Sequence, residues 1–357
     1  MLPGVPELHI AGQLSVYTGA LLSTNSSRKK KDRVQQIDDQ PASLFGEALL
    51  SKPKTEDADA HALLSLFFFR RILDHRALSL CVQHFRPLSR FFQQSEGELK
   101  AFFAQNNHLR GYVDASQLAS GSQRAGAFRY AERMEGLMRG PFPGSLVLSD
   151  NPRFVPRLRN SRLGIHWVFC HPSARIPMSG PAVAIIGSRD STRQQLEAAC
   201  DVAHAVGAMR GTVITGLATG ADAAAHTAAR DTEALLVAVL GSGVAKPYPP
   251  SSSRLVEELL SGRGTVLTEV PPDYTPNADA FVLRNRIVAA LADVVVAVSG
   301  KYASGTAHTI RFAADAKVPV LSADPAPNSG ITKLVLELGG EVMSPDGVRA
   351  TLAREEE

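Results

Sequence analysis

Four glycine-rich segments of this sequence combine small hydroxyl side chains with basic ones, which is the residue chemistry of an anion-binding loop. They are GSRDS (187–191), GLATGAD (216–222), GSGVAKPYPP (241–250) and SGKYASGTAHT (299–309). Three of the four carry a cation, namely Arg189, Lys246 and Lys301. Glycine lets a phosphate approach the main chain, and the N-terminus of a following helix favours negative charge. These segments predict phosphate-binding loops, with simple strand-to-helix turns as the alternative for any one of them.

A fifth segment, NADAFVLRNRIVAALAD (277–293), places an aromatic residue and two arginines just before an apolar helix. The members of this cluster are Phe281, Arg284, Asn285 and Arg286. Arginines at alternate positions beside an aromatic ring can clamp a sugar-phosphate backbone and stack one base. The alternative is that an arginine pairs with an internal acid, Glu269 or Asp293, and that Phe281 belongs to the core. Both interpretations stay open for each arginine.

Six runs rich in valine and isoleucine alternate with helical segments in the second half of the chain. The runs are AVAIIG (182–187), GTVITG (211–216), LLVAVLG (235–241), TVLTEV (265–270), DVVVAVSG (293–300) and VPVLSA (318–323). Between them, a segment such as 190–207 begins with capping residues, carries an apolar stripe and ends at glycine. Repeated strand and helix units predict a doubly wound parallel sheet, an extended Rossmann-like α/β fold. Such sheets bind ligands beyond the carboxyl ends of their strands, where the glycine-rich segments fall.

The first half of the chain divides into regions of different composition. Residues 1–58 mix small polar residues and prolines with the basic run RKKKDR (28–33), so we expect a weakly ordered extension. From 59 to 140 apolar residues recur at helical spacing, which predicts a small all-helical domain before a sheet domain at 141–350. The phenylalanines of this region recur among leucines at that spacing, so core packing is favoured over base stacking.

Composition and charge exclude several classes of protein. A net charge of +3 excludes a uniformly basic nucleic-acid coat but allows a local basic patch. Cys81, Cys170 and Cys200 are odd in number and widely spaced, so neither a disulfide framework nor a zinc site is expected. No apolar run reaches the roughly 20 residues of a membrane span, and the start lacks the order of a signal peptide. We therefore expect a cytoplasmic protein with no metal or organic cofactor.

Taken in order, several segments resemble the successive motifs of the DprA/Smf family of DNA-processing proteins, which is related to the LOG nucleotide-binding proteins. They include AVAIIGSR, ITGLATGADAAAH, AVLGSGVAKPYPP, LTEVPPDYTP and FVLRNRIVAALADVVVAVSGKYASGTAHTIRFA. The resemblance spans residues 140–345. It implies an extended Rossmann-like domain that binds single-stranded DNA, usually as a homodimer. The preceding helices are then expected to be of the SAM or helix-hairpin-helix kind.

The loop chemistry and the resemblance together give the expected site residues, and the resemblance also implies partners. The expected DNA or phosphate contacts are Gly187, Ser188, Arg189, Gly216, Thr219, Gly220, Gly241, Gly243, Lys246, Phe281, Arg284, Asn285, Arg286, Lys301, Ser304, Gly305 and Thr306. The family is described as helping to load the RecA recombinase in DNA recombination and natural transformation. DprA-like proteins also occur beside toxins in phage-defence operons, so an antitoxin-like regulatory role with a toxin partner is the other expectation.

An enzyme is the main alternative to a binding protein. LOG-type relatives cleave nucleotides with a glutamate after the late glycine-rich loop, whereas this sequence has His308 in that region and no acid until Asp315. Asp222 and His226 are four residues apart on one helix face, so they are a candidate acid–base pair, although a structural contact is more common. We expect binding rather than catalysis, with a nucleotide sensor or LOG-like nucleotide-cleaving enzyme as the alternative. A third hypothesis makes the helical domain a protein-interaction module.

Overall fold

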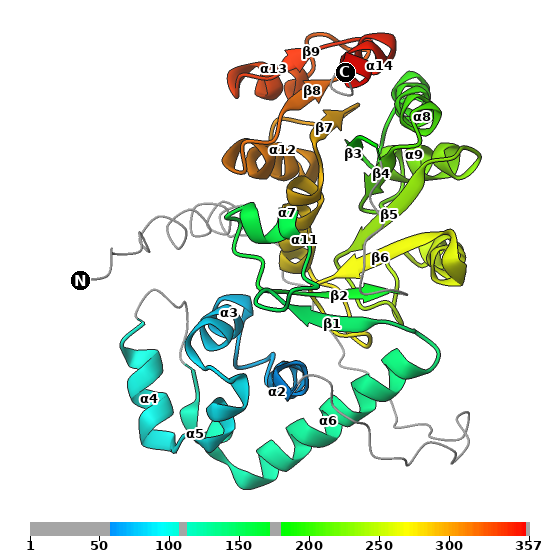
Figure 1. The fold of residues 1–357 in the computed structure, drawn as a ribbon. Helices are drawn as coiled ribbons and strands as arrows, with labels where there is room; N and C mark the ends of the chain where they lie inside the picture. The colour runs from blue at the N-terminus through cyan, green and yellow to red at the C-terminus, as the bar shows by residue number, and fades with distance from the viewer. Residues whose placement is uncertain (1–57, 107–112, 172–179, 355–357) are drawn as a thin grey trace, which may run out of the picture. The chain divides into compact units, whose positions relative to one another are not determined.

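The described part of the chain begins with a set of helices. A computed structural model describes residues 58–106, 113–171 and 180–354 (Figure 1). The opening elements are α2 (Ala58–Phe67), α3 (His75–His84), the 3-10 helix η1 (Leu88–Gln93), α4 (Glu96–Ala104), α5 (Ala115–Ala119) and α6 (Gly121–Arg139). The helices predicted before the sheet are thereby confirmed, while the extension predicted before residue 59 lies outside the described residues except for Ala58. No helix of the described ranges is both long and apolar enough for a membrane crossing.

Side-chain caps fix where several of these helices begin. The Ser95 hydroxyl accepts from the Glu98 N–H, and the Glu98 carboxylate accepts from the Ser95 N–H, which forms a capping box. The carboxylates of Asp74 and Asp114 cap α3 and α5 by accepting backbone N–H groups. Most of the phenylalanines predicted for the core meet between these helices, with no more than 9% exposure. They are Phe67, Phe69, Phe91, Phe102 and Phe103.

Nine strands form one sheet within the described residues. In chain order they are β1 (Ser145–Leu148), β2 (Trp167–His171), β3 (Ala182–Ile186), β4 (Thr212–Thr215), β5 (Leu235–Leu240), β6 (Gly264–Thr268), β7 (Val294–Ala297), β8 (Val320–Ser322) and β9 (Glu341–Val342). Their order across the sheet is β1-β2-β6-β5-β4-β3-β7-β8-β9. Strands β3 to β9 are parallel, and the six predicted valine-rich runs coincide with β3 to β8, while β9 was not predicted. The predicted fold class, a doubly wound parallel sheet after a set of helices, is confirmed.

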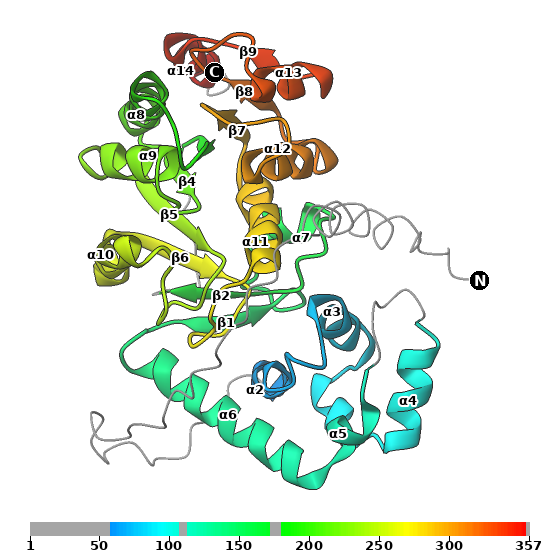
Figure 2. The same ribbon diagram turned by 180° about the vertical axis from the view of Figure 1, so that it is seen from behind.

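Helices cover both faces of the parallel part of the sheet (Figures 1 and 2). They are α7 (Pro156–Asn160), α8 (Arg193–Ala208), α9 (Ala221–Arg230), η2 (Pro250–Ser252), α10 (Ser253–Glu258), η3 (Leu259–Arg263), α11 (Ala278–Leu291), α12 (Gly305–Asp315), α13 (Gly330–Glu337) and α14 (Pro345–Arg354). α8 packs against α9 and α14 on one face, and α11 packs against α12 on the other. Every residue of β3, β4 and β7 is buried. Burial on both faces explains why these strands are continuous apolar runs in the sequence.

An antiparallel strand pair joins the sheet to the preceding helices. β1 pairs with β2, and β2 pairs with β6, both in antiparallel register. Trp167 and Phe169 of β2 share a core with the helical region, and each ring lies 5.9 Å from the ring of Phe67 in α2. α2 and α3 lie beside this edge (Figure 1). The helical region and the sheet are therefore packed together through β1 and β2, two strands that the sequence did not predict.

Candidate nucleic-acid interface

The strand order changes direction between β3 and β7, which lie side by side in the sheet. From β3 the chain proceeds to β4, β5 and β6 on one side, and from β7 it proceeds to β8 and β9 on the other. Ser299, which follows β7, joins the two loops because its hydroxyl accepts from the Ser188 N–H at 2.7 Å and lies 2.7 Å from the Ser191 hydroxyl. Two predicted glycine-rich segments thus meet where doubly wound sheets bind their ligands.

A pocket of about 350 Å³ opens over these two loops, and we call it the switch-point pocket. Most of the predicted contact residues line it: Gly187, Ser188, Arg189, Phe281, Arg284, Asn285, Lys301, Ser304, Gly305 and Thr306. Asp190, Ala218, Asp222 and Thr309 belong to the same lining but were not among the predicted contacts. The structure therefore brings the first loop, the late loop and the aromatic and basic cluster to one place.

Cationic and aromatic side chains form the rim of the switch-point pocket. Arg189 and Lys301 are exposed, and the Arg189 guanidinium lies 5.7 Å from the centre of the Phe281 ring. Phe281 is only half-buried, and its ring lies 5.4 Å from that of Tyr248 on the neighbouring loop. The exposed carboxylate of Asp190 offsets part of the positive charge. Phe281 is thus not a core residue, and the rim presents aromatic surface next to a guanidinium, a combination that binds stacked bases and phosphates.

The first turn of α12 forms another wall of the pocket. The Ser304 hydroxyl caps this helix by accepting from the Ala307 N–H at 3.4 Å, and it donates to the Lys301 carbonyl at 2.6 Å. Asn285 of α11 holds the same turn, because its side-chain amide donates to the Gly305 carbonyl at 3.1 Å. A helix N-terminus carries partial positive charge and free N–H groups, so this wall favours an anion.

Arg284 lies at the back of the pocket and is 8% exposed. Its Nη1 donates to the Val239 carbonyl at 2.6 Å, while the nearby Asp222 carboxylate accepts from the Gly216 N–H at 3.0 Å. Burial lowers the pKa of Arg284 and raises the pKa of Asp222, and the attraction between the two opposes both shifts. The buried Arg284 Nε has no hydrogen-bond partner among the described residues. An unpaired buried N–H is costly, so this guanidinium is an incompletely satisfied group at the back of the pocket.

Replacing Gly216 by alanine is expected to lower the free energy of unfolding by about 1–3 kcal/mol. A Cβ at this position would lie 1.7 Å from Arg284 Nη1, and the Val239 carbonyl and Asp222 hold that guanidinium in place. Urea unfolding of the variant and the wild type measures the loss. Gly97→Ala in α4 is the control, because nothing lies within 4 Å of a Cβ there. Equal unfolding free energies for wild type and Gly216→Ala would contradict the prediction.

Arg286, the second arginine of the cluster, points into the protein. It is 1% exposed, its Nη2 donates to the Glu269 carboxylate at 2.7 Å and its Nη1 donates to the Leu163 carbonyl at 2.6 Å. His75 of α3 lies 3.3 Å from the same carboxylate. Burial acts to raise the pKa of Glu269, but Arg286 and His75 outweigh it and hold that pKa below its usual range. Internal pairing therefore accounts for Arg286, and the structure does not bring it to the switch-point pocket.

The remaining predicted contacts lie outside the lining of the pocket. They are Gly216, Thr219, Gly220, Gly241, Gly243 and Lys246. Gly220 has φ of +81° at the turn that opens α9, a conformation that favours glycine. Lys246 is exposed on the loop after β5, and its ammonium lies 3.4 Å from the Thr275 hydroxyl. Gly241 is buried beneath that loop, close to the Phe281 ring. These glycines shape the turns around the pocket rather than lining it.

Comparison with known proteins places this chain in a family. Residues 145–343 match the family described as DNA recombination-mediator protein A. The chain belongs to this DprA family. DNA processing protein DprA of Mycobacterium tuberculosis is 38% identical over 141 residues, which make up 39% of this chain and 36% of that protein. The chain thus matches little more than a third of the length of this DprA relative.

Two solved DprA structures have the same fold. DprA from Streptococcus pneumoniae superimposes with a TM-score of 0.53 and 22% identity, over 71% of this chain and 91% of that one. DprA from Helicobacter pylori, a protein described for its single-stranded DNA binding mode, superimposes with a TM-score of 0.52 and 21% identity, over 60% of this chain and 97% of that one. At these identities the two structures support the DprA fold alone.

The candidate acid–base pair of this DprA-family chain, Asp222 and His226, is buried within the fold. Asp222 is turned toward the Gly216 N–H and Arg284, and it is 7% exposed. His226 is 1% exposed, and burial lowers its pKa to about 4, so the imidazole is neutral at pH 7. Within the described residues no hydrogen bond joins the two side chains. Their arrangement favours the structural interpretation of this pair over acid–base catalysis.

Two residues in or beside the switch-point pocket were not among the predicted contacts, although the sequence carries a signal for each. Tyr248 is the aromatic residue of the glycine-rich segment 241–250, and the cis proline that follows it lies in the same loop. Thr309 lies one helical turn after Gly305 and Thr306, so a helix starting at the late loop brings the three to one wall. An aromatic residue within a glycine-rich loop is the kind of signal that could have identified Tyr248.

Proposed function

We propose that the protein binds single-stranded DNA at the switch-point pocket and acts in DNA processing or recombination. The observation that carries the proposal is the rim, where Arg189 and Lys301 are exposed beside the half-buried ring of Phe281. Guanidinium and ammonium groups neutralise phosphates, and an exposed ring can stack on a base of any sequence. Membership of the DprA family and the single-stranded DNA binding of the Helicobacter pylori protein support it. The proposal places the protein in the cytoplasm, with its DNA.

The affinity for single-stranded DNA is expected to fall steeply as salt rises. Each neutralised phosphate of a single strand adds about −0.7 to the slope of log K against log salt, so the two rim cations alone give about −1.4. Fluorescence anisotropy of a labelled oligonucleotide, titrated from about 50 to about 200 mM salt, measures this slope. An uncharged peptide nucleic acid of the same sequence is the matched probe and should not bind at any of these concentrations. A salt-independent affinity would contradict phosphate binding at the rim.

The proposed function also includes protein partners that act on the bound strand. The family description, a recombination mediator, supports transfer of the strand to a RecA-type recombinase by a homodimer of this chain. An antitoxin-like role beside a toxin protein is the other outcome that would use the same strand-binding surface. Light scattering of the purified protein gives its oligomeric state, and a strand-exchange assay with RecA and a single-strand-binding protein tests the loading. Unchanged RecA filament formation in the presence of this protein would contradict the recombinase role.

A mononucleotide is the second candidate ligand of the switch-point pocket. The pocket of about 350 Å³ has the first turn of α12 as one wall, and a helix N-terminus suits a single phosphate as well as a strand. Incubation with nucleoside monophosphates and triphosphates, followed by thermal unfolding and chromatography, separates the two ligands. A higher Tm with a nucleotide supports a sensor, and released free base supports a nucleotide-cleaving enzyme. No change in Tm or in the nucleotide leaves the strand as the ligand.

A further inference from the structure

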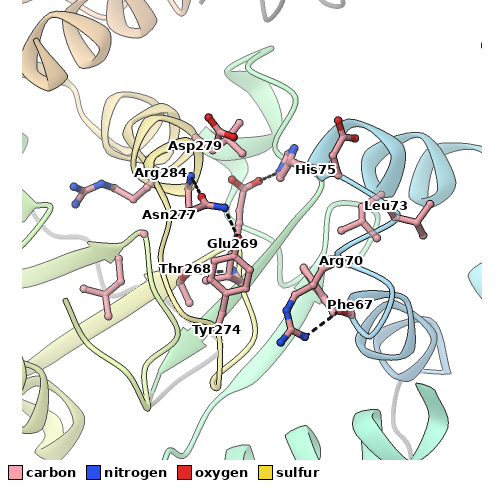
Figure 3. A pocket seen from close by; sticks show the side chains of 17 residues that line it. Phe67, Arg70, Leu73, His75, Thr268, Glu269, Tyr274, Asn277, Asp279 and Arg284 are labelled. Atoms are coloured by element: carbon pink, nitrogen blue, oxygen red, sulfur yellow. Dashed lines mark hydrogen bonds and ion pairs between the residues drawn. The ribbon is translucent and has the colours of Figure 1, made fainter. Parts of the chain in front are cut away.

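A second pocket of about 160 Å³ lies between the helical region and the sheet (Figure 3). On the sheet side it is formed by the ends of β5 and β6 and the first turns of α11, and on the other side by the segment from α2 to α3. Because α2 and α3 cover it, we call it the roofed pocket. Apart from Arg284, it shares no lining residue with the switch-point pocket, so its occupant is a separate question.

The interior of the roofed pocket is apolar, and its buried carboxylate is already paired. Phe67, Leu73 and Leu240 line it with no more than 3% exposure. The buried carboxylate at its floor is Glu269, which accepts from the guanidinium of Arg286 at 2.7 Å. The guanidinium of Arg284 is directed away from the other lining side chains (Figure 3), so the interior offers no unpaired buried charge to a ligand. It therefore favours an uncharged, largely apolar group.

The rim of the roofed pocket has the opposite charge balance to that of the switch-point pocket. Arg70 and two carboxylates, Asp74 and Asp279, line the pocket and are exposed, so a phosphate here meets more negative than positive charge. Tyr274 provides a half-buried aromatic wall (Figure 3). A carboxylate can accept hydrogen bonds from the amino group of a base, as Asp and Glu do from cytosine in DNA complexes. The rim thus suits a ring that carries an amino group and no charge.

The two pockets lie on neighbouring faces of α11. Arg284 lines both of them, and Figure 3 shows its guanidinium directed away from the other side chains of the roofed pocket, so only its aliphatic stem forms part of this wall. Gly241 lines the roofed pocket and lies against Phe281, which lines the switch-point pocket. A nucleotide whose phosphate is bound on one face of α11 is therefore next to an apolar pocket on the other.

We propose that the roofed pocket takes an uncharged heteroaromatic ring with an amino group, supplied by a base of the strand whose phosphates occupy the switch-point pocket. The source of the ring rests on the proposed function. The chemistry of the ring is inferred from the lining of the pocket alone. A free nucleoside has the same chemistry and is the other possible source. The helical region then takes part in binding, because it provides the roof of the pocket.

Two substitutions test the pocket without touching the phosphate site. Ala280→Leu fills the pocket from α11, where Ala280 lines it and is 7% exposed, and Tyr274→Ala removes the aromatic wall. The probes are an oligodeoxycytidine and an abasic polymer of the same length. Both variants should bind oligodeoxycytidine about 10-fold more weakly than the wild type, a typical effect of losing one stacked base, and bind the abasic polymer as the wild type does. Tyr274→Phe, which keeps the ring, should retain the wild-type preference.

The control is Phe128→Ala, which removes a 39% exposed aromatic ring from α6, outside both pockets. This variant should bind both polymers as the wild type does. The inference is overturned if Ala280→Leu and Tyr274→Ala keep the full preference for oligodeoxycytidine. It is also overturned if the two variants lose affinity for both polymers equally, because the loss then comes from the phosphate site or from the fold.

Cytidine alone distinguishes the source of the ring. A rise in Tm with cytidine in the wild type, absent in Ala280→Leu, would assign the pocket to a free nucleoside. An effect seen only with the strand assigns it to a base of the strand. If the wild type binds neither polymer, the proposed function fails, and the cytidine result alone decides this inference: stabilisation retains the ring chemistry, and no stabilisation overturns it.

Discussion

Reversing the charges of Arg189 and Lys301 together is expected to weaken the binding of single-stranded DNA by about 100-fold or more. A hydrogen bond to a charged group contributes about 1.5–3 kcal/mol, and two such contacts to phosphates amount to this loss before any repulsion from the new carboxylates. Both side chains are exposed, and neither forms an ion pair within the described ranges, so the fold should tolerate the change. Anisotropy titrations with a labelled oligonucleotide measure the affinity of Arg189→Glu/Lys301→Glu.

The control is a double variant with the same change in net charge at sites outside the switch-point pocket. Lys100 lies on α4 and Arg254 on α10, both exposed and absent from the lining. Lys100→Glu/Arg254→Glu should bind within a few-fold of the wild type, because surface charges far from the ligand are screened by salt. The rim variant should also show a salt slope shallower by about 1.4, since two phosphate contacts are lost. Equal losses in the two double variants would show that net charge, and not the rim, governs binding.

Removing the Glu269 carboxylate is expected to lower the free energy of unfolding by about 3–5 kcal/mol, because Arg286 would remain buried without its partner. Arg286 is 1% exposed and its guanidinium donates to Glu269 at 2.7 Å, so it has no route to solvent in the folded state. Glu269 also connects the helical region to the sheet through His75 of α3. Urea unfolding of Glu269→Ala against the wild type, followed by circular dichroism, measures the change.

Two further variants distinguish an unpaired charge from a general loss of packing. Asp279→Ala removes an exposed carboxylate from the roofed pocket, which Glu269 also lines. It should change the unfolding free energy by less than about 0.5 kcal/mol. The double variant Arg286→Met/Glu269→Leu should be more stable than Glu269→Ala, because it leaves no buried charge. A double variant as unstable as Glu269→Ala would contradict the argument from charge.

The ion pair between Arg286 and Glu269 also predicts how the free energy of unfolding depends on pH. The folded-state pKa of Glu269 is lowered, so its contribution is present above the usual carboxyl pKa and is lost as pH falls through the lower folded value. The stability difference between wild type and Glu269→Ala should therefore shrink in acid and persist at pH 7.

The parallel sheet was predictable because its strands are buried on both faces and are therefore apolar along their whole length. The run AVAIIG shows this, since all five residues of β3 are buried. The antiparallel strands β1 and β2 were not predicted. Val147 and Val168 face one way while Trp167 and Phe169 join the core of the helices, and that partner is formed by residues 58–139, far away in the sequence. A strand whose apolar face depends on a distant partner gives a weak local signal.

The sequence by itself determined which segments carry the candidate site: glycine-rich loops after buried strands, and a cluster of an aromatic residue with basic ones in α11. It could not determine which arginine of the cluster serves the pocket. Arg284 and Arg286 differ by two positions in α11, which turns their side chains to different sides of the helix. One reaches the back of the switch-point pocket, and the other is paired with Glu269 beneath α3. The tertiary structure alone decided between them, because the packing of α11 between the sheet and the helical region sets which side meets the acid.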